Sequence, residues 1–160
     1  MIYSNACSYA IRAMTRLAVL RPDSYVLLDE LCEDSDLPRH FVAKIFQDLV
    51  RKGLLLSAKG RGGGFALARP ADKITLYDIV AIVDGSEQLE RCVVGYSTCN
   101  DTQPCPHHEQ WKPIKLQINE FLNHTTLAMM AVSMQSKLAI LGRELPKPTS
   151  KSKPVRTTGN

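Results

Sequence analysis

Three consecutive glycines between two short apolar runs constrain the fold of this chain more than any other feature of its sequence. The glycines are residues 62–64, and the apolar runs are residues 54–57 and 65–68. Runs of this length joined by a glycine-rich turn predict two short strands paired as a β-hairpin. Lys59 and Arg61 lie in the same turn. The sequence therefore predicts a small hairpin with a basic tip.

The hairpin follows directly on a predicted amphipathic helix, residues 38–52. Pro38 stands in its first turn, where a missing N–H does no harm, and Gly53 ends it. Apolar side chains recur on one face, which carries Phe41, Val42, Ile45, Phe46, Leu49 and Val50. The opposite face is mainly polar and carries Arg39, His40, Ala43, Lys44, Gln47 and Arg51. We expect the first face in the core and the second at the surface.

Two further helical segments precede this helix. Apolar residues at helical spacing after Ser4 and Asn5, either of which can cap a helix, predict an amphipathic helix over residues 5–20. A short helix around residues 29–33 and a polar turn at residues 34–36 follow. Two helices joined by a tight turn and followed by a basic hairpin form a winged helix. The predicted fold is mainly α with a small β-wing, a winged helix-turn-helix DNA-binding domain plus a long dimerisation helix.

The second half of the chain divides into further segments. Thr75 and Asp78 form a capping-box pattern ahead of a helix expected to end near Gly85. Beyond residue 111, an apolar stripe predicts one continuous helix, which carries Ile114, Ile118, Phe121, Leu122, Leu127 and Met130. So small a domain cannot cover this stripe alone, so we expect a dimer interface. The predicted segments are a DNA-binding domain at 1–85, a cysteine-rich cluster-binding loop at 86–110, a dimerisation helix region at 111–142 and a disordered basic tail at 143–160.

The net charge of +4 is less informative than its distribution along the chain. Four cations and no acid in residues 146–160 account for the whole excess. Residues 23–36 hold six acids and no lysine or arginine, whereas residues 39–69 hold seven basic residues against one acid, Asp48. Positive charge is therefore concentrated on the second helix of the helix-turn-helix and on the hairpin, where a winged helix contacts DNA.

A helix in the major groove and a basic loop in the minor groove would account for this charge. The candidates for reading bases from the helix are Arg39, His40, Lys44 and Gln47. On the hairpin the candidates are Lys59, Arg61 and Gly62, since glycines let a backbone approach DNA closely. Arg51 and Lys52 are expected to contact phosphates. Two alternatives remain: a merely solvated polar face, or a phosphate cradle, although the glycines neither precede Lys-Ser or Lys-Thr nor open a helix.

Three of the five cysteines fall within fourteen residues, in the pattern C-x6-C-x5-C-x2-H. The pattern consists of Cys92, Cys99, Cys105 and His108. Three thiolates and an imidazole in one loop suit either an iron–sulfur cluster or a structural zinc ion, and spacing alone does not separate the two. His107 is the alternative to His108 as the fourth ligand. Cys7 and Cys32 lie in helical patterns and are expected in the core.

Several classes of function are disfavoured. No run approaches the roughly 18 apolar residues of a membrane span, and the N-terminal segment is amphipathic, so we expect a cytoplasmic protein with no membrane partner. No pattern supplies a base and an oxyanion site for a nucleophilic cysteine, so we expect no enzymatic activity and no small-molecule substrate. Three functions remain: an iron–sulfur transcription regulator, a winged-helix regulator with structural zinc, and a small iron–sulfur electron-transfer protein.

Several motifs together resemble one bacterial family. They are residues 9–14, 46–54, 59–65, 80–85 and 105–111. With the three clustered cysteines, they make the chain from about residue 1 to residue 141 similar to the IscR-like members of the Rrf2 family of winged-helix transcriptional regulators. The resemblance implies a homodimer that binds a pseudo-palindromic operator in double-stranded DNA. It also implies one iron–sulfur cluster per subunit, whose state modulates DNA affinity.

The resemblance bears on the type of cluster as well. In IscR-like members the cluster is of the 2Fe–2S type with a histidine as fourth ligand, and His108 is the matching position. In nitric-oxide-responsive relatives the cluster is 4Fe–4S and an acid from the partner's first helix is the fourth ligand; the matching position here is Ser8, a poor ligand. The resemblance therefore favours 2Fe–2S over 4Fe–4S. The first cysteine gap is one residue longer than in the IscR-like members, a difference that would alter the cluster geometry or move the fourth ligand to His107. On the second helix of the helix-turn-helix, Ala43 and Lys44 replace the Glu–Gln pair typical of those members, so the DNA target need not be the same.

Overall fold

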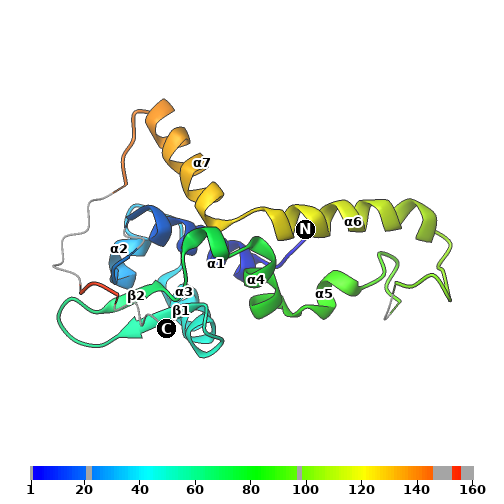
Figure 1. The fold of residues 1–160 in the computed structure, drawn as a ribbon, viewed down its shortest axis with the longest axis horizontal. Helices are drawn as coiled ribbons and strands as arrows, with labels where there is room; N and C mark the ends of the chain where they lie inside the picture. Colours follow the sequence, from blue (N-terminus) through cyan, green and yellow to red (C-terminus); the bar gives the residue numbers. More distant parts are fainter. Residues whose placement is uncertain (1, 21–22, 97–98, 146–152, 156–160) are drawn as a thin grey trace.

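The computed structural model describes residues 2–20, 23–96, 99–145 and 153–155. In chain order its elements are α1 (Asn5–Leu20), α2 (Leu28–Cys32), α3 (Arg39–Arg51), β1 (Leu55–Ala58), β2 (Gly64–Leu67), η1 (Ala71–Lys73), α4 (Leu76–Val80), η2 (Ala81–Gly85), α5 (Glu87–Glu90), α6 (His108–His124) and α7 (Leu127–Ile140). Figure 1 shows α6 extending away from a body that contains α1 to α4 and the hairpin. Helices and an antiparallel hairpin in this order confirm the predicted winged-helix fold.

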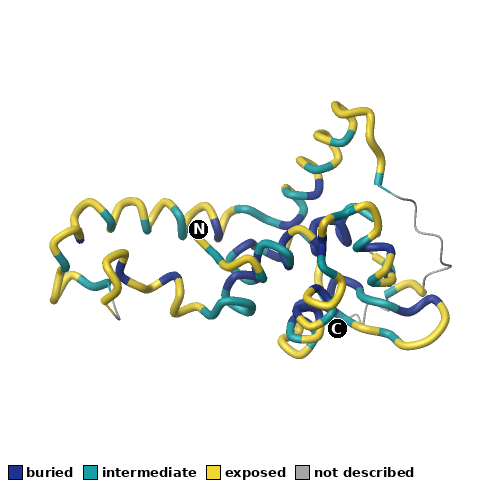
Figure 2. Tube along the Cα trace, turned by 180° about the vertical axis from the view of Figure 1, so that it is seen from behind, coloured by how far each residue is buried: buried dark blue, intermediate teal, exposed yellow. Residues whose placement is uncertain are grey.

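Helix α1 is the centre of the core. Its bounds are those predicted from the sequence, and Ala10, Ala13, Met14 and Leu17 are fully buried. Helices α3 and α7 both pack against it, and Figure 2 shows the buried parts of the chain gathered around these elements. Cys7 is also fully buried in α1, and burial raises the pKa of its thiol to about 12. The prediction that Cys7 is a core residue is therefore confirmed.

Helix α3 ends where the sequence predicted, at Gly53. The Gly53 N–H donates to the Val50 carbonyl at 3.0 Å, and the Leu54 N–H donates to the Leu49 carbonyl at 2.9 Å. This is a Schellman motif, which needs a left-handed residue, and Gly53 has φ +76°. The motif turns the chain directly into the hairpin.

The predicted core face of α3 is wrong at one position. Val42, Phe46 and Leu49 are fully buried, but Phe41 is 62% exposed. Phe41 lies in the first turn, just after the chain leaves Pro38, and the buried stripe begins only at the next residue. Helical periodicity alone does not show where along a helix the core begins.

The hairpin pairs with a third piece of chain. Its register runs from Leu55 opposite Leu67 to Ala58 opposite Gly64, one residue away from the predicted strand ends. Val26, from the segment before α2, exchanges two backbone hydrogen bonds with Phe65, each 2.8 Å long. A Cβ atom on Gly64 would lie 2.1 Å from the Val26 carbonyl oxygen. At least one of the three glycines is therefore required by the packing of the hairpin itself.

The capping box ahead of α4 is confirmed. The Thr75 hydroxyl accepts a hydrogen bond from the Asp78 N–H at 3.2 Å, and the Asp78 carboxylate accepts one from the Thr75 N–H at 3.0 Å. The helix continues as the wider turn η2 and ends at Gly85, as predicted.

The single helix predicted beyond residue 111 is wrong. The structure has α6 and α7 instead, separated at Thr125. There the Thr125 carbonyl accepts from the Leu76 N–H at 2.9 Å and the Leu127 N–H donates to the Ile74 carbonyl at 2.8 Å. Thr126 then caps α7 through the Met129 N–H. These contacts with the start of α4 and the residues just before it break the helix, although the apolar spacing continues across the break. No helix in the described part of the chain is both long and apolar enough to cross a membrane.

Most of the predicted basic tail, 143–160, lies outside the described residues. Within it, residues 153–155 run beside the segment before α2. The Lys153 N–H donates to the Gly62 carbonyl at 3.0 Å, and the Val155 N–H donates to the Asp23 carbonyl at 3.0 Å. This part of the tail therefore contacts the hairpin turn.

Candidate functional site

The outer face of α3 presents the predicted base-reading side chains to solvent. His40, Lys44 and Gln47 are exposed and recur at intervals of three or four residues, which places them along one stripe of the helix. Among the described residues neither His40 nor Lys44 forms an ion pair. Their hydrogen-bonding groups are therefore available to a ligand.

Two arginines of the same helix are engaged with acids of the chain. Arg39 pairs with Asp29 of α2, and Arg51 pairs with Asp48 one turn earlier. The hydrogen bond from Arg39 lowers the pKa of Asp29 and raises that of Arg39. The pair between Arg39 and Asp29 connects the two helices of the helix-turn-helix at the surface. Arg39 therefore has a partner within the fold, and its predicted contact with DNA stays a prediction.

The hairpin continues this surface. Lys59 and Arg61 are exposed at its turn, and Figure 2 shows the turn as an exposed loop. A shallow groove of about 500 Å³ separates α3 from the hairpin, and its lining includes Gln47, Arg51 and Lys59 and no acid. Gly62, in contrast, is buried, with its carbonyl bonded to the Lys153 N–H. The groove joins the two basic elements into one surface.

The cysteine-rich loop brings its four predicted ligands together in two pairs. Cys92 and Cys105 form one pair, in which each thiol shifts the pKa of the other. The Val94 backbone and the Cys105 thiol lower the pKa of Cys92, whereas burial and the Cys92 thiol raise the pKa of Cys105. The second pair is Cys99 and His108, with the sulfur 3.6 Å from imidazole Nδ1.

His108 differs sharply from its neighbour His107. The His108 side chain is only 4% exposed, and its Nε2 lies 2.8 Å from an Asp101 carboxylate oxygen. Asp101 also accepts from the Lys112 ammonium at 2.8 Å, and these two partners lower its pKa, Lys112 most strongly. His107 is exposed at the start of α6. Of the two candidate histidines, His108 is the one that faces a cysteine.

Asp101 is a site residue that the sequence reasoning missed. It lies between the second and third cysteines of the pattern, and it orients the imidazole through the nitrogen that does not face Cys99. A carboxylate in this position fixes which ring nitrogen is free to act as a ligand. An acid inside the cysteine pattern was the available signal.

The two pairs do not converge on one point. No group of three or more histidine, cysteine or acidic side chains in the described residues is placed to hold a single metal ion. The loop is attached to α6 by Lys115, whose ammonium donates to the Glu90 carboxylate at 2.8 Å. Trp111 and Cys92 line the same depression beside the loop.

Helices α6 and α7 carry apolar side chains that the described chain does not cover. Ile114, Leu116 and Phe121 of α6 are 48%, 60% and 51% exposed. Figure 2 shows α6 largely exposed along its length. This uncovered apolar surface agrees with the expectation of a partner for α6.

Comparison with known proteins adds an independent line of observation. The Rrf2 family model, described as an iron-dependent transcriptional regulator, matches residues 3–133. The HTH-type transcriptional regulator IscR of Sodalis glossinidius is 30% identical over 152 residues, which are 93% of this chain and 91% of the relative. These matches span both the helix-turn-helix and the cysteine-rich loop.

Solved structures share the architecture. CymR, the global cysteine regulator of B. subtilis, superposes with a TM-score of 0.70 at 25% identity, over 81% of this chain and 95% of CymR. The structure of T. potens IscR superposes with a TM-score of 0.67 at 25% identity, over 84% of this chain and 88% of that one. The similarity extends over most of each chain.

Proposed function

Because the chain belongs to the Rrf2 family of transcriptional regulators, we propose that it is a homodimer whose affinity for an operator depends on a bound iron–sulfur cluster. Family membership makes it a regulator of transcription rather than an enzyme.

The DNA-binding role of single residues follows from their placement. Arg39, His40, Lys44 and Gln47 would face base edges in the major groove, with Lys44 and Gln47 on the exposed stripe beside the acid-free groove. Lys59 and Arg61 would enter the adjacent minor groove. Arg51 and Lys52 would contact phosphates and fix the register. Gly62 would act by shaping the turn, since its backbone is buried against the tail.

A second copy of the chain is the proposed partner of α6. A winged helix reads only one half-site, and a dimer places two recognition helices at a fixed spacing on DNA. The exposed apolar residues of α6 offer the surface for a symmetric interface. The cysteine-rich loop precedes α6 directly and is tied to it through Lys115. The placement of the loop and the spacing of the two recognition helices would therefore be linked.

The ligand set proposed for the cluster is Cys92, Cys99, Cys105 and His108. The donor chemistry fits: thiolates are the usual ligands of iron–sulfur clusters, and a histidine can replace a thiolate. The single observation that carries this proposal is the position of His108, buried with one nitrogen toward Cys99 and the other held by Asp101. When bound, the cluster would supply a redox-active centre of the 2Fe–2S type. The alternative 4Fe–4S type would need another ligand, for which Ser8 is poorly suited.

A structural zinc ion is the alternative use of the same four residues. A zinc site uses four ligands around one point, and the same three thiolates and imidazole would supply them, so the donor set alone does not separate zinc from a cluster. An electron-transfer protein is disfavoured, because such a protein has no use for the exposed basic stripe of α3. The description of the Rrf2 family as iron-dependent regulators is what favours the cluster over zinc.

Anaerobic purification of the full-length protein tests the proposal. Iron, acid-labile sulfide and zinc are measured on the same sample as the visible absorption spectrum. We expect a coloured protein with iron and sulfide near stoichiometric amounts. Both should be lost in Cys99→Ala and retained in Cys32→Ala, because Cys32 belongs to α2 and not to the loop. A colourless protein with one zinc ion per chain would contradict the proposed cluster and indicate a structural zinc site instead.

A further inference from the structure

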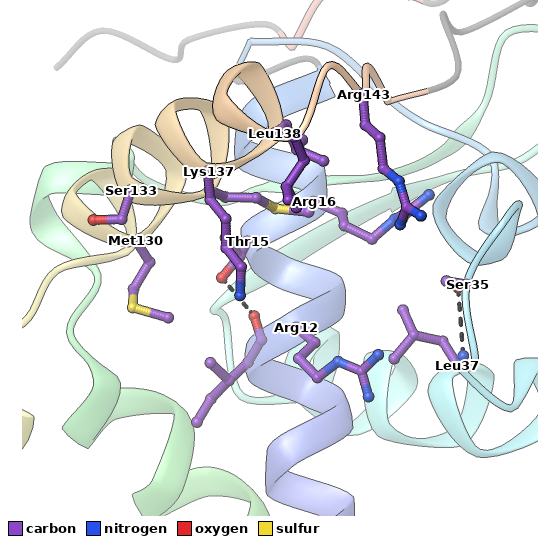
Figure 3. A pocket seen from close by; sticks show the side chains of 13 residues that line it. Arg12, Thr15, Arg16, Ser35, Leu37, Met130, Ser133, Lys137, Leu138 and Arg143 are labelled. Atoms are coloured by element: carbon purple, nitrogen blue, oxygen red, sulfur yellow. Dashed lines mark hydrogen bonds between the residues drawn. The ribbon is translucent and has the colours of Figure 1, made fainter.

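A cavity of about 450 Å³ lies between α1 and α7, next to the turn that connects α2 to α3. Figure 3 shows it from close by, with α7 above and α1 behind the side chains that line it. Its lining shares no residue with the recognition stripe, the hairpin or the cysteine-rich loop. Its volume is within the range of sites that bind small molecules.

All charged side chains that line this cavity are cationic. They are Arg12, Arg16, Lys137 and Arg143. Arg12 is already paired with Asp36 at the surface. Within the described residues, Lys137 and Arg143 form no ion pair. Two cations on α7 and the turn after it are therefore available to an anion.

Arg16 is the most unusual of the four. It is 6% exposed, and its Nη2 donates to the Glu33 carbonyl at 2.6 Å, but its Nε is buried and has no hydrogen-bond partner. Burial lowers the pKa of Arg16, an effect that nearby Cys32, Asp34 and Glu33 partly offset. A buried N–H without a partner is rare in native structures, and a bound acceptor is one common explanation.

The position of Arg143 is fixed by the end of α7. The Gly142 N–H donates to the Ala139 carbonyl at 3.1 Å, and the Arg143 N–H donates to the Leu138 carbonyl at 2.9 Å. This second Schellman motif, with Gly142 at φ +60°, turns the chain back over the cavity. In Figure 3 the Arg143 side chain reaches from the end of α7 toward the side chain of Arg16.

The remaining walls are mostly apolar. The apolar lining residues are Ile11, Leu37, Met130, Met134, Leu138 and Leu141, and the uncharged polar ones are Thr15, Ser35 and Ser133. The hydroxyls of Thr15 and Ser35 donate to carbonyls of the chain, to Ile11 and Cys32 respectively, each at 2.7 Å. The cavity therefore has a cationic end and an apolar remainder. A molecule that suits it carries an anionic group at one end and an apolar chain at the other.

We propose that this cavity is a binding site for a small amphipathic organic anion, of which a medium-chain carboxylate is the simplest example. The anionic group would lie among Arg16, Lys137 and Arg143, and the apolar body would pack on the methionines of α7. Binding at this site requires neither the proposed cluster nor DNA. A negative result in the binding experiment below would therefore leave the proposed function unaffected, and the reverse also holds.

Binding is measured on the full-length protein without DNA. The fluorescent probe 8-anilinonaphthalene-1-sulfonate, an amphipathic anion, is titrated and then displaced with decanoate or with uncharged decanol. We expect saturable binding that decanoate reverses and decanol does not. The double variant Lys137→Ala/Arg143→Ala should bind the probe about tenfold or more weakly. The control Lys73→Ala removes an exposed cation outside the cavity and should bind as the wild type does.

Methionine methyl resonances give the location independently of affinity. With the methionine methyl groups labelled with carbon-13, decanoate should shift the signals of Met130 and Met134, which line the cavity. The neighbouring Met129 is 56% exposed and does not line it, so its signal should stay in place. Displacement by decanol as effective as by decanoate, unchanged binding in the double variant, or a shift of Met129 alone would each overturn the proposal.

Discussion

The His108 imidazole stands between two side chains of the same loop, with Nδ1 3.6 Å from the Cys99 sulfur and Nε2 2.8 Å from an Asp101 carboxylate oxygen. An imidazole held at one nitrogen by a carboxylate presents the other nitrogen in a fixed direction, which is how histidine ligands of metal centres are usually oriented. The neighbouring His107 is exposed and has no such arrangement. Of the two histidines, only His108 is therefore oriented as a metal ligand would be.

Replacing these two histidines one at a time should therefore give different results. His108→Ala should lower the iron and sulfide content of the anaerobically purified protein well below that of the wild type, because a ligand is lost. His107→Ala should leave both contents unchanged and serves as the matched control. Equal losses in the two variants would contradict the assignment of His108 as fourth ligand.

The hairpin glycines should differ in their effect on stability. Gly64→Ala places a Cβ atom 2.1 Å from the Val26 carbonyl, so the backbone must move. The free energy of unfolding should fall by about 2–4 kcal/mol, measured by urea denaturation. Gly60→Ala meets only open space at φ +83° and should cost about 1 kcal/mol, the penalty of the left-handed conformation alone. Similar losses in both variants would argue against the contact with Val26.

The two basic elements should contribute differently to DNA binding. Lys44→Ala should relax base preference at one operator position, because Lys44 lies on the exposed stripe of α3. Arg61→Ala should weaken binding most at A·T-rich flanks, where the minor groove is narrow. Binding is compared across an operator library with and without each substitution. If each substitution instead lowered the affinity for all sequences equally, both residues would be assigned to phosphate contacts.

The dimer should depend on α6. Phe121→Glu places a charge on a half-exposed apolar position and should convert the dimer to a monomer in sedimentation equilibrium. Val132→Glu makes the same change at a position of α7 that is 62% exposed, and leaves α6 intact. A dimer that survives Phe121→Glu but not Val132→Glu would move the interface to α7.

Local sequence rules predicted a large part of the fold. The bounds of α1, the end of α3 at Gly53 and the capping box at Thr75 each depend on residues close together in the chain, so the sequence contains the whole signal. The candidate ligands were selected in the same way, from the spacing of three cysteines and a histidine, and their role stays a prediction.

The errors share a different cause. The break at Thr125 depends on hydrogen bonds with Ile74 and Leu76, about 50 residues away in the chain. The exposure of Phe41 depends on where the core begins, and the role of Asp101 depends on the fold of the loop. The cavity beside Arg16 is formed by helices distant in sequence. The helix break and the cavity have no local pattern, because they arise from contacts between remote segments, whereas Asp101 was missed although it lies inside the cysteine pattern.

Operator binding by the protein with and without its cluster tests most directly whether the cluster controls the affinity for DNA. The protein purified with its cluster and the same protein after cluster removal are titrated against one operator under anaerobic conditions, with Cys99→Ala alongside. We predict that the dissociation constants of the two states differ by at least about fivefold, the range of a modest allosteric coupling. We also predict that Cys99→Ala, still a folded dimer, behaves as the cluster-free state. Equal dissociation constants for all three samples would contradict the claim that this loop controls DNA binding.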